Sequence, residues 1–196
     1  MISSIELTVL GLINYRPMHG YKLCNFFEEK GIYDMMEIKK PSVYSILKRY
    51  EKEGLISGEY EFDENNPPRK VYSATDKGIK FLRDNLKDFL LNYSSLNPAG
   101  FWHLLRFCKN NVTQEEFIEI IKHMKGVFLS HMRDLDKKKE NLIKNFSEPE
   151  MNYFTLMEDM FVVLHKANLK ALNGFISFAE NSENESYFLK KEEIKE

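Results

Sequence analysis

The sequence has few cysteines and no long apolar run. Its 196 residues include only two cysteines, Cys24 and Cys108. Both lie in apolar, helix-like surroundings, which favours buried reduced thiols over a disulfide framework. No apolar run approaches the roughly 20 residues that span a bilayer, and the first residues form a helix-capping pattern instead of a secretion signal. The composition predicts a cytoplasmic protein without a membrane segment.

The motifs of common catalytic and metal sites are missing as well. The sequence contains no His-Glu-x-x-His, no Cys-x-x-Cys, no Gly-x-Ser-x-Gly and no phosphate-binding glycine loop. Its five histidines are dispersed, and two of them eight residues apart, His123 and His131, do not make a metal site. We therefore expect no catalytic residue, metal or cofactor, and a small helical enzyme remains only as a rival hypothesis.

The sequence carries almost no excess charge, since its formal net charge is −2. Many DNA-binding domains are markedly basic, but attraction to phosphates depends on the local potential. Acidic residues gather between residues 180 and 196. Cations gather between residues 39 and 70, at Lys39, Lys40, Lys48, Arg49, Lys52, Arg69 and Lys70.

A basic amphipathic helix is predicted after Pro41. Its apolar residues follow the spacing i, i+3, i+4 and i+7, at Val43, Ile46, Leu47 and Tyr50. Ser42 is the expected N-cap and Gly54 the expected stop. Hydroxyls near the helix start can read base edges, and cations further along can hold phosphates. The candidate DNA contacts here are Lys39, Lys40, Ser42, Tyr44, Ser45, Lys48 and Arg49, although an ordinary solvated basic face gives the same pattern.

A β-hairpin is predicted directly after this helix. Residues 56–63 alternate between apolar and acidic side chains, residues 65–68 form a turn, and residues 69–74 return as a second strand. Arg69 and Lys70 then lie beside the hairpin tip and are candidate DNA contacts. Upstream, the capping box Ser3-x-x-Glu6 begins a first helix, and residues 21–27 form a second. This order predicts a winged helix-turn-helix with a two-stranded β-wing.

Several ordered runs of residues carry a family resemblance, and they cover about the first 80 residues. These runs are Leu10-Gly11-Leu12, Arg16-Pro17-Met18-His19-Gly20-Tyr21-Lys22-Leu23, Ser42-Val43-Tyr44, Leu47-Lys48-Arg49, Glu53-Gly54-Leu55-Ile56, Pro68-Arg69-Lys70-Val71-Tyr72 and Thr75-Asp76-Lys77-Gly78. With them the chain resembles the PadR-type transcriptional regulators. The resemblance implies a dimeric winged-helix protein that binds double-stranded DNA, often as a repressor, and whose C-terminal helices dimerise and respond in some relatives to a small molecule.

The remainder of the chain is predicted to be helical. We expect a winged-helix domain with its linker helix at residues 1–95, an all-α dimerisation and effector domain at residues 96–181, and a frayed tail at residues 182–196. The last long helix carries apolar residues near coiled-coil spacing, at Phe154, Met157, Phe161, Leu164, Asn168, Leu172 and Phe175. We interpret this stripe as the homodimer contact; the alternative is packing within one chain.

Aromatic residues gather where the two expected domains join. They are Tyr93, Phe101, Trp102, His103 and Phe107. A small aromatic effector is one hypothesis, since the family resemblance implies that some relatives sense phenolic acids or flat hydrophobic drugs. The alternative is that these rings only pack the linker helix against its neighbours. A third reading of the whole chain is a winged helix used for protein–protein contact without DNA affinity.

Overall fold

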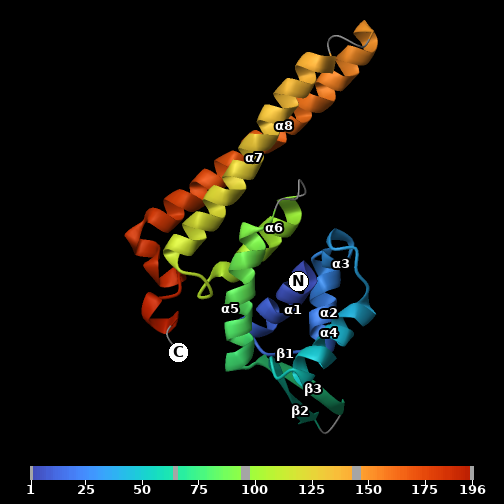
Figure 1. Cartoon of the computed structure of the whole chain (residues 1–196). Helices are drawn as coiled ribbons and strands as arrows, with labels where there is room; N and C mark the ends of the chain where they lie inside the picture. The colour runs from blue at the N-terminus through green and yellow to red at the C-terminus, as the bar shows by residue number, and fades with distance from the viewer. Residues whose placement is uncertain (1, 64–65, 94–97, 143–146, 195–196) are drawn as a thin grey trace. The chain divides into compact units, whose positions relative to one another are not determined.

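The computed structural model describes residues 2–63, 66–93, 98–142 and 147–194. Contacts divide the chain into two compact units, the first comprising Met1–Val112 with Phe188–Glu196 and the second comprising Thr113–Tyr187. The first unit contains α1 (Ser4–Tyr15), β1 (Met18–His19), α2 (Gly20–Glu29), α3 (Ile32–Met35), α4 (Lys40–Lys52), β2 (Ile56–Asp63), β3 (Asn66–Ala74), α5 (Asp76–Leu91), α6 (Pro98–Leu105), η1 (Arg106–Cys108) and η3 (Lys191–Ile194) (Figure 1).

Helix α1 forms the centre of the first unit. The predicted capping box is confirmed, because the backbone N–H of Ser3 donates to Glu6 Oε2 at 2.6 Å and the backbone N–H of Glu6 donates to Ser3 Oγ. The seven residues from Leu7 to Ile13 are all buried. They pack against α4, α5, α6 and β3, so α1 holds the helix-turn-helix and the wing on one core.

Helix α4 is the basic helix that the sequence predicts. Its apolar stripe is buried, with Tyr50 only 1% exposed. The expected cap is wrong: α4 begins at Lys40, its N-cap is Lys39, and Ser42 lies inside the first turn. The helix can start earlier because Pro41 is compatible with its first turn. Backbone N–H groups in the first turn make no hydrogen bond within the helix, so the missing N–H of proline costs nothing there. The segment between α2 and α4 is packed against the unit, since Ile32 in α3 is 1% exposed.

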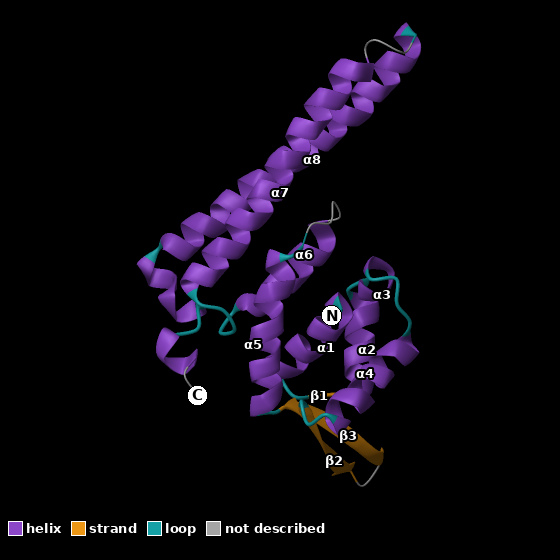
Figure 2. Cartoon of the chain, in the orientation of Figure 1, coloured by secondary structure: helices purple, strands orange, loops and turns teal. Residues whose placement is uncertain are grey.

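The wing belongs to a three-stranded antiparallel sheet with the order β1-β3-β2 (Figure 2). The hairpin strands are confirmed, but the third strand was not predicted: Met18 pairs with Tyr72 and His19 with Val71. Strand β3 also starts earlier than expected, at Asn66, so the two prolines lie in the strand and not in the turn. They are tolerated where the register shifts between Glu61 and Asp63, since a bulge leaves residues without ladder hydrogen bonds.

Helix α5 follows the wing and is closely packed against its base. Its N-cap is Thr75, whose hydroxyl accepts from the backbone N–H of Gly78 at 3.1 Å. Gly78 lies so close to the preceding segment that a Cβ built on it would lie 1.9 Å from the carbonyl oxygen of Leu55. Glycine is therefore required here by close approach of two backbone segments.

The second unit is a helical hairpin made of α7 (Gln114–Leu142) and α8 (Glu148–Glu180), followed by η2 (Ser182–Tyr187). A capping box begins α7, because the N–H of Thr113 donates to Glu116 Oε2 at 2.9 Å and the N–H of Glu116 donates to the Thr113 hydroxyl at 3.2 Å. Phe117 contacts Phe175 and Phe128 contacts His165, so the helices run antiparallel. The mainly α fold class, a winged helix-turn-helix followed by an all-α region, is confirmed. Within the described residues, no helix is long and apolar enough to cross a membrane.

The end of the chain returns to the first unit. Phe188 and Leu189 are buried, and the N–H of Leu189 donates to the carbonyl oxygen of Val112 at 2.9 Å. A frayed tail was predicted here, because Phe188 and Leu189 stand among charged neighbours and show neither a helical nor a strand period. Their burial shows that these two residues are packed. The compact units divide at Val112, whereas the predicted functional boundary at residue 95 stays a prediction.

Candidate nucleic-acid interface

The outward face of α4 presents polar and cationic side chains. Ser42, Ser45 and Lys48 are exposed, and Tyr44 is 47% exposed. The Ser45 hydroxyl donates to the carbonyl oxygen of Pro41 at 3.0 Å, which leaves the hydroxyl oxygen facing outward as an acceptor. Among the residues that the structure describes, none forms a hydrogen bond or ion pair with the Lys48 ammonium. Lys48 is therefore available to a phosphate.

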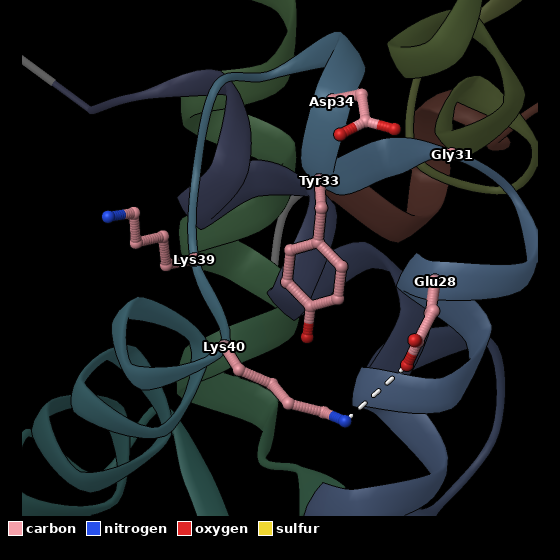
Figure 3. Close-up of a pocket in the computed structure, with 6 residues that line it drawn as sticks. All are labelled: Glu28, Gly31, Tyr33, Asp34, Lys39 and Lys40. Atoms are coloured by element: carbon pink, nitrogen blue, oxygen red, sulfur yellow. Dashed lines mark hydrogen bonds and ion pairs between the residues drawn. The ribbon is translucent and has the colours of Figure 1, made fainter.

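Lys39 and Lys40 border a hollow of about 390 Å³ at the start of α4 (Figure 3). The Nζ atom of Lys40 lies 3.4 Å from Glu28 Oε2, whereas the Lys39 side chain points away from the Tyr33 ring. Burial is the main cause that raises the pKa of Tyr33, which therefore stays protonated. The structure thus divides the two lysines: Lys40 is tied to α2, and Lys39 extends toward solvent.

Arg49 does not lie with Lys48 on the outward face. Its guanidinium forms an ion pair with Glu6 of α1, and its Nε lies 3.9 Å from Glu53 Oε1. The hydrogen bond to Glu6 is the largest cause that raises the pKa of Arg49. The pKa of Glu6 is lowered overall. Burial, the largest single cause, acts to raise it, but the hydrogen bonds from Ser3 and Arg49 together outweigh burial. Arg49 thus joins α4 to the capped end of α1.

Both cations of the wing contact neighbouring elements. Arg69 Nη1 donates to the Tyr21 hydroxyl at 3.2 Å, and its guanidinium carbon lies 5.2 Å from the Tyr21 ring centroid. Lys70 Nζ lies 2.5 Å from Glu51 Oε1 and also lies over the Tyr60 ring, 5.5 Å from its centroid. Arg69 therefore connects the wing to α2, and Lys70 connects it to α4.

The wing also carries acidic side chains that oppose phosphate binding. Glu59 and Glu61 are exposed on β2, and Glu61 Oε2 lies 3.2 Å from His19 Nε2. His19 is stacked on Tyr21, with the ring centroids 5.3 Å apart. The surface most favourable to a polyanion is therefore the outward face of α4, together with the part of the wing where Arg69 contacts α2.

Two residues of this surface were not among the candidate contacts. Tyr21, 38% exposed, holds Arg69, and exposed Lys52 follows Lys48 by one helical turn. Lys52 has a clear sequence signal, since i+4 spacing places it on the same face. Tyr21 has none, because its role depends on the pairing of β1 with β3.

The candidate effector aromatics lie together in the first unit. Phe101 is fully buried and contacts Tyr93 and Trp102, with centroid distances of 6.0 and 5.4 Å. His103 is 4% exposed and contacts Phe107 at 5.8 Å, and its buried Nε2 has no hydrogen-bond partner among the described residues. Burial, with a smaller contribution from Arg106, lowers the pKa of His103 to about 4. These rings form a packed cluster.

The candidate dimer residues of α8 divide into two groups. Leu172 is fully buried, whereas Phe175 contacts Phe117 of α7 but remains 37% exposed. The Asn168 side chain donates to the carbonyl oxygen of Leu164 at 3.0 Å. Partly exposed members are Phe154, Met157, Phe161 and Leu164. Further exposed apolar residues beside them, which the sequence analysis did not select, are Tyr153, Leu156, Met160 and Val163. Their spacing of three, four and three is a coiled-coil signal that was present in the sequence.

The sequence is similar to known proteins over the region of the winged helix and beyond it. The sequence model of the transcriptional regulator PadR-like family matches residues 9–84. The Negative transcriptional regulator PadR of Bacillus subtilis (strain 168) is 21% identical over 184 residues, which cover 90% of this chain and 94% of that protein. The matched family consists of transcriptional regulators and not of enzymes.

Solved structures of similar chains have low identity. The crystal structure of Bacillus subtilis PadR in complex with operator DNA is 17% identical, covers 91% of this chain and 100% of its own, and has a TM-score of 0.40. The PadR-like transcriptional regulator BC1756 from Bacillus cereus is 19% identical, covers 89% and 97%, and has a TM-score of 0.35. Over residues 9–84, which run from α1 into α5, the chain is therefore similar to the transcriptional regulator PadR-like family.

Proposed function

We propose that this regulator binds double-stranded DNA sequence-specifically and acts as a homodimeric repressor. The single observation that supports this most is the outward face of α4, where Ser42, Ser45 and Lys48 are exposed on a helix fixed by its buried stripe. The relative from Bacillus subtilis is a negative regulator, and its structure contains operator DNA. This supports the same activity for the present chain.

In the proposed complex, α4 lies in the major groove. The hydroxyls of Ser42 and Ser45 and the Tyr44 ring face base edges, since a helix enters that groove with its first turns. Lys39 and Lys48 contact phosphates on either side. The other four candidate cations have protein partners in the free state, and each must exchange its partner for a phosphate before it contributes to binding. The pairs are Lys40 with Glu28, Arg49 with Glu6, Arg69 with Tyr21, and Lys70 with Glu51.

Dimerisation through α8 is supported by the apolar surface it exposes. Leu156 is 71% and Val163 is 65% exposed on a helix whose other side packs on α7. A contiguous apolar stripe of this kind is usually covered by a partner in solution. Two copies related by a dyad would read a pseudo-palindrome with half-sites about 34 Å apart, or a multiple of that distance.

A small aromatic effector is a second part of the proposal. The observation that favours it is the unpartnered Nε2 of His103, which lies among aromatic rings. A ligand hydroxyl reaching this nitrogen would supply the missing hydrogen bond. Trp102 fluorescence during titration with phenolic compounds tests the idea, and an unchanged signal across a broad panel would favour the packing role.

The function is tested by selection of duplexes from a random pool with the full chain. We expect enrichment of an inverted repeat and sub-micromolar binding to it, with affinity that decreases steeply as salt increases. The Ser42→Ala variant should enrich a more degenerate repeat, whereas Lys48→Ala should enrich the same repeat with lower affinity. Absence of DNA binding at low salt would overturn the proposal and favour a protein–protein module.

A further inference from the structure

A hollow of about 360 Å³ lies beside α4, on the side where Arg49 meets α1. It belongs entirely to the first unit, and its walls come from the start of α1, the end of α4 and the middle of α5. The lining residues are Ile2, Glu6, Arg49, Tyr50, Glu53, Phe81 and Asn85. None of them belongs to the aromatic cluster proposed for an effector.

The buried phenol of Tyr50 borders this hollow without a hydrogen bond. The residue is 1% exposed, and its hydroxyl has no hydrogen-bond partner among the described residues. Its ring meets Phe81 edge-on, with the centroids 6.4 Å apart. A buried hydroxyl normally bonds to protein, ordered water or a ligand. Tyr50 therefore brings a hydroxyl without a hydrogen bond of normal geometry to this wall of the hollow, beside the Arg49 guanidinium, which lies 5.3 Å from its ring centroid.

The charges around the hollow favour a cation. Two carboxylates, Glu6 and Glu53, face one guanidinium, that of Arg49. The Glu6 carboxylate already accepts from Ser3 and Arg49, whereas Glu53 Oε1 is 3.9 Å from Arg49 Nε and its side chain is 48% exposed. Glu53 is thus the carboxylate with room for a further donor.

We propose that this hollow binds a small organic cation, an amidinium or guanidinium carried on a flat apolar body. Its charged group lies between the Glu53 carboxylate and the Tyr50 hydroxyl, which accepts one of its hydrogen bonds. The flat body lies against Phe81 and Ile2. The volume suits such a ligand, since small-molecule pockets begin at about 300 Å³.

Occupancy of this hollow changes the DNA interface if the proposed function holds. The ligand cation competes with Arg49 for Glu53 and so removes one of the two carboxylate contacts that hold the guanidinium, leaving only the ion pair with Glu6 of α1. Arg49 lies next to Lys48 in α4, so a released guanidinium adds a cation near the phosphates. The ligand therefore increases DNA affinity, in contrast to an inducer.

The binding itself is tested without DNA, by calorimetry and amide chemical shifts of the full chain with benzamidinium and with guanidinium at constant ionic strength. Neutral benzamide is the matched control ligand, because it has the same flat body without the charge. We expect saturable binding of benzamidinium, with shift changes confined to the start of α1, the end of α4 and α5. Benzamide should bind at least about tenfold more weakly.

Two variants distinguish binding at this hollow from non-specific attraction of the cation to carboxylates elsewhere on the protein. Tyr50→Phe removes only the hydroxyl, and Glu53→Gln removes the charge of an exposed side chain, so the fold is retained in both. Each should weaken benzamidinium binding about tenfold, whereas Glu59→Gln, an exposed carboxylate on β2, should leave it unchanged. Unsaturable binding, or equal affinity in all three variants, overturns the proposal.

The consequence for DNA is measured separately with a labelled duplex. Saturating benzamidinium should increase the affinity of the parent protein for the duplex about threefold to tenfold. It should leave the duplex affinity of the Arg49→Ala variant unchanged. If the cation binds but DNA does not, the proposed function fails and the site stands. If DNA binds and benzamidinium does not, the site fails and the proposed function stands.

Discussion

Lys70 of the wing and Glu51 of α4 form an ion pair, with Nζ and Oε1 2.5 Å apart. The hydrogen bond to Glu51 is the largest cause that raises the pKa of Lys70. Because the wing and the helix that we propose to enter DNA are joined here, the pair also decides how much positive charge the interface presents. A phosphate that approaches Lys70 must compete with this carboxylate.

Glu51→Gln is therefore expected to increase affinity for any duplex. The change releases Lys70 and removes a carboxylate from the interface, so the salt dependence of binding should steepen by about one unit. Glu59→Gln is the matched control, since it removes the same charge from an exposed position on β2. Anisotropy titrations at several salt concentrations measure both. Equal gains in the two variants would mean that only net charge matters.

Lys48→Ala and Arg49→Ala should behave differently although the residues are adjacent. Lys48 points outward, so its loss should weaken binding to all duplexes and make the salt slope shallower by about one. Arg49 is ion-paired with Glu6, so its loss should mainly lower the free energy of unfolding and should change the salt slope less. Binding titrations and urea unfolding of both variants provide the comparison. Identical behaviour would contradict the different orientations.

Gly78→Ala should strongly destabilise the first unit. Its Cβ would lie 1.9 Å from the Leu55 carbonyl oxygen, and backbone atoms cannot move aside as a side chain can, so the expected cost is about 3 kcal/mol. The control is Gly126→Ala on α7, where nothing lies within 4 Å and helix propensity predicts a gain of about 0.5–1 kcal/mol. Urea unfolding measures both. A neutral Gly78→Ala would refute the close approach.

His103 should make stability decrease on mild acidification. Its pKa is 6.5 in the unfolded chain and about 4 in the folded protein, so below pH 6.5 the unfolded chain binds a proton that the folded protein does not. The contribution to stability is complete above that pH and is lost as pH falls toward 4. The expected loss from pH 7 to pH 5 is about 2 kcal/mol.

His103→Leu tests this assignment, because leucine fills similar space and does not titrate. Urea unfolding near pH 7 and near pH 5 should show a smaller difference for the variant than for the parent. A pH dependence that survives the substitution undiminished would mean that other groups cause it.

Leu156→Glu and Val163→Glu should prevent dimer formation. Both side chains are largely exposed on α8, so a charge there is harmless to the single chain but is buried at the proposed contact. Sedimentation velocity should show monomers for these variants and dimers for the parent. Tyr15→Glu on α1, where the tyrosine is 77% exposed, should remain dimeric. A dimeric Leu156→Glu variant would place the contact elsewhere.

Local signals in the sequence were sufficient to predict most of the helices. The capping pairs of α1 and α7 join residues three apart, and the stripe of α4 repeats within one helix, so neither depends on the rest of the fold. The alternation in β2 is similarly local. These features required no knowledge of which segments meet.

The features that the sequence did not reveal depend on distant segments. A two-residue strand such as β1 has no period, and only its pairing with Tyr72 and Val71 defines it. The helical position of Arg49 is compatible with DNA contact, and only the neighbouring Glu6 turns its guanidinium away from the outward face. The buried position of Leu189 likewise follows from a contact with Val112.

The hydrogen bond between Val112 and Leu189 also means that residues 113–187 are a topological insertion into the first unit. The chain leaves that unit and re-enters it at neighbouring backbone atoms 2.9 Å apart. Excision of the inserted hairpin and closure of the gap with a short flexible linker would leave every element from α1 to η1 intact. The product would carry a single copy of the proposed DNA-binding surface. Its affinity for one half-site could then be measured without the contribution of avidity.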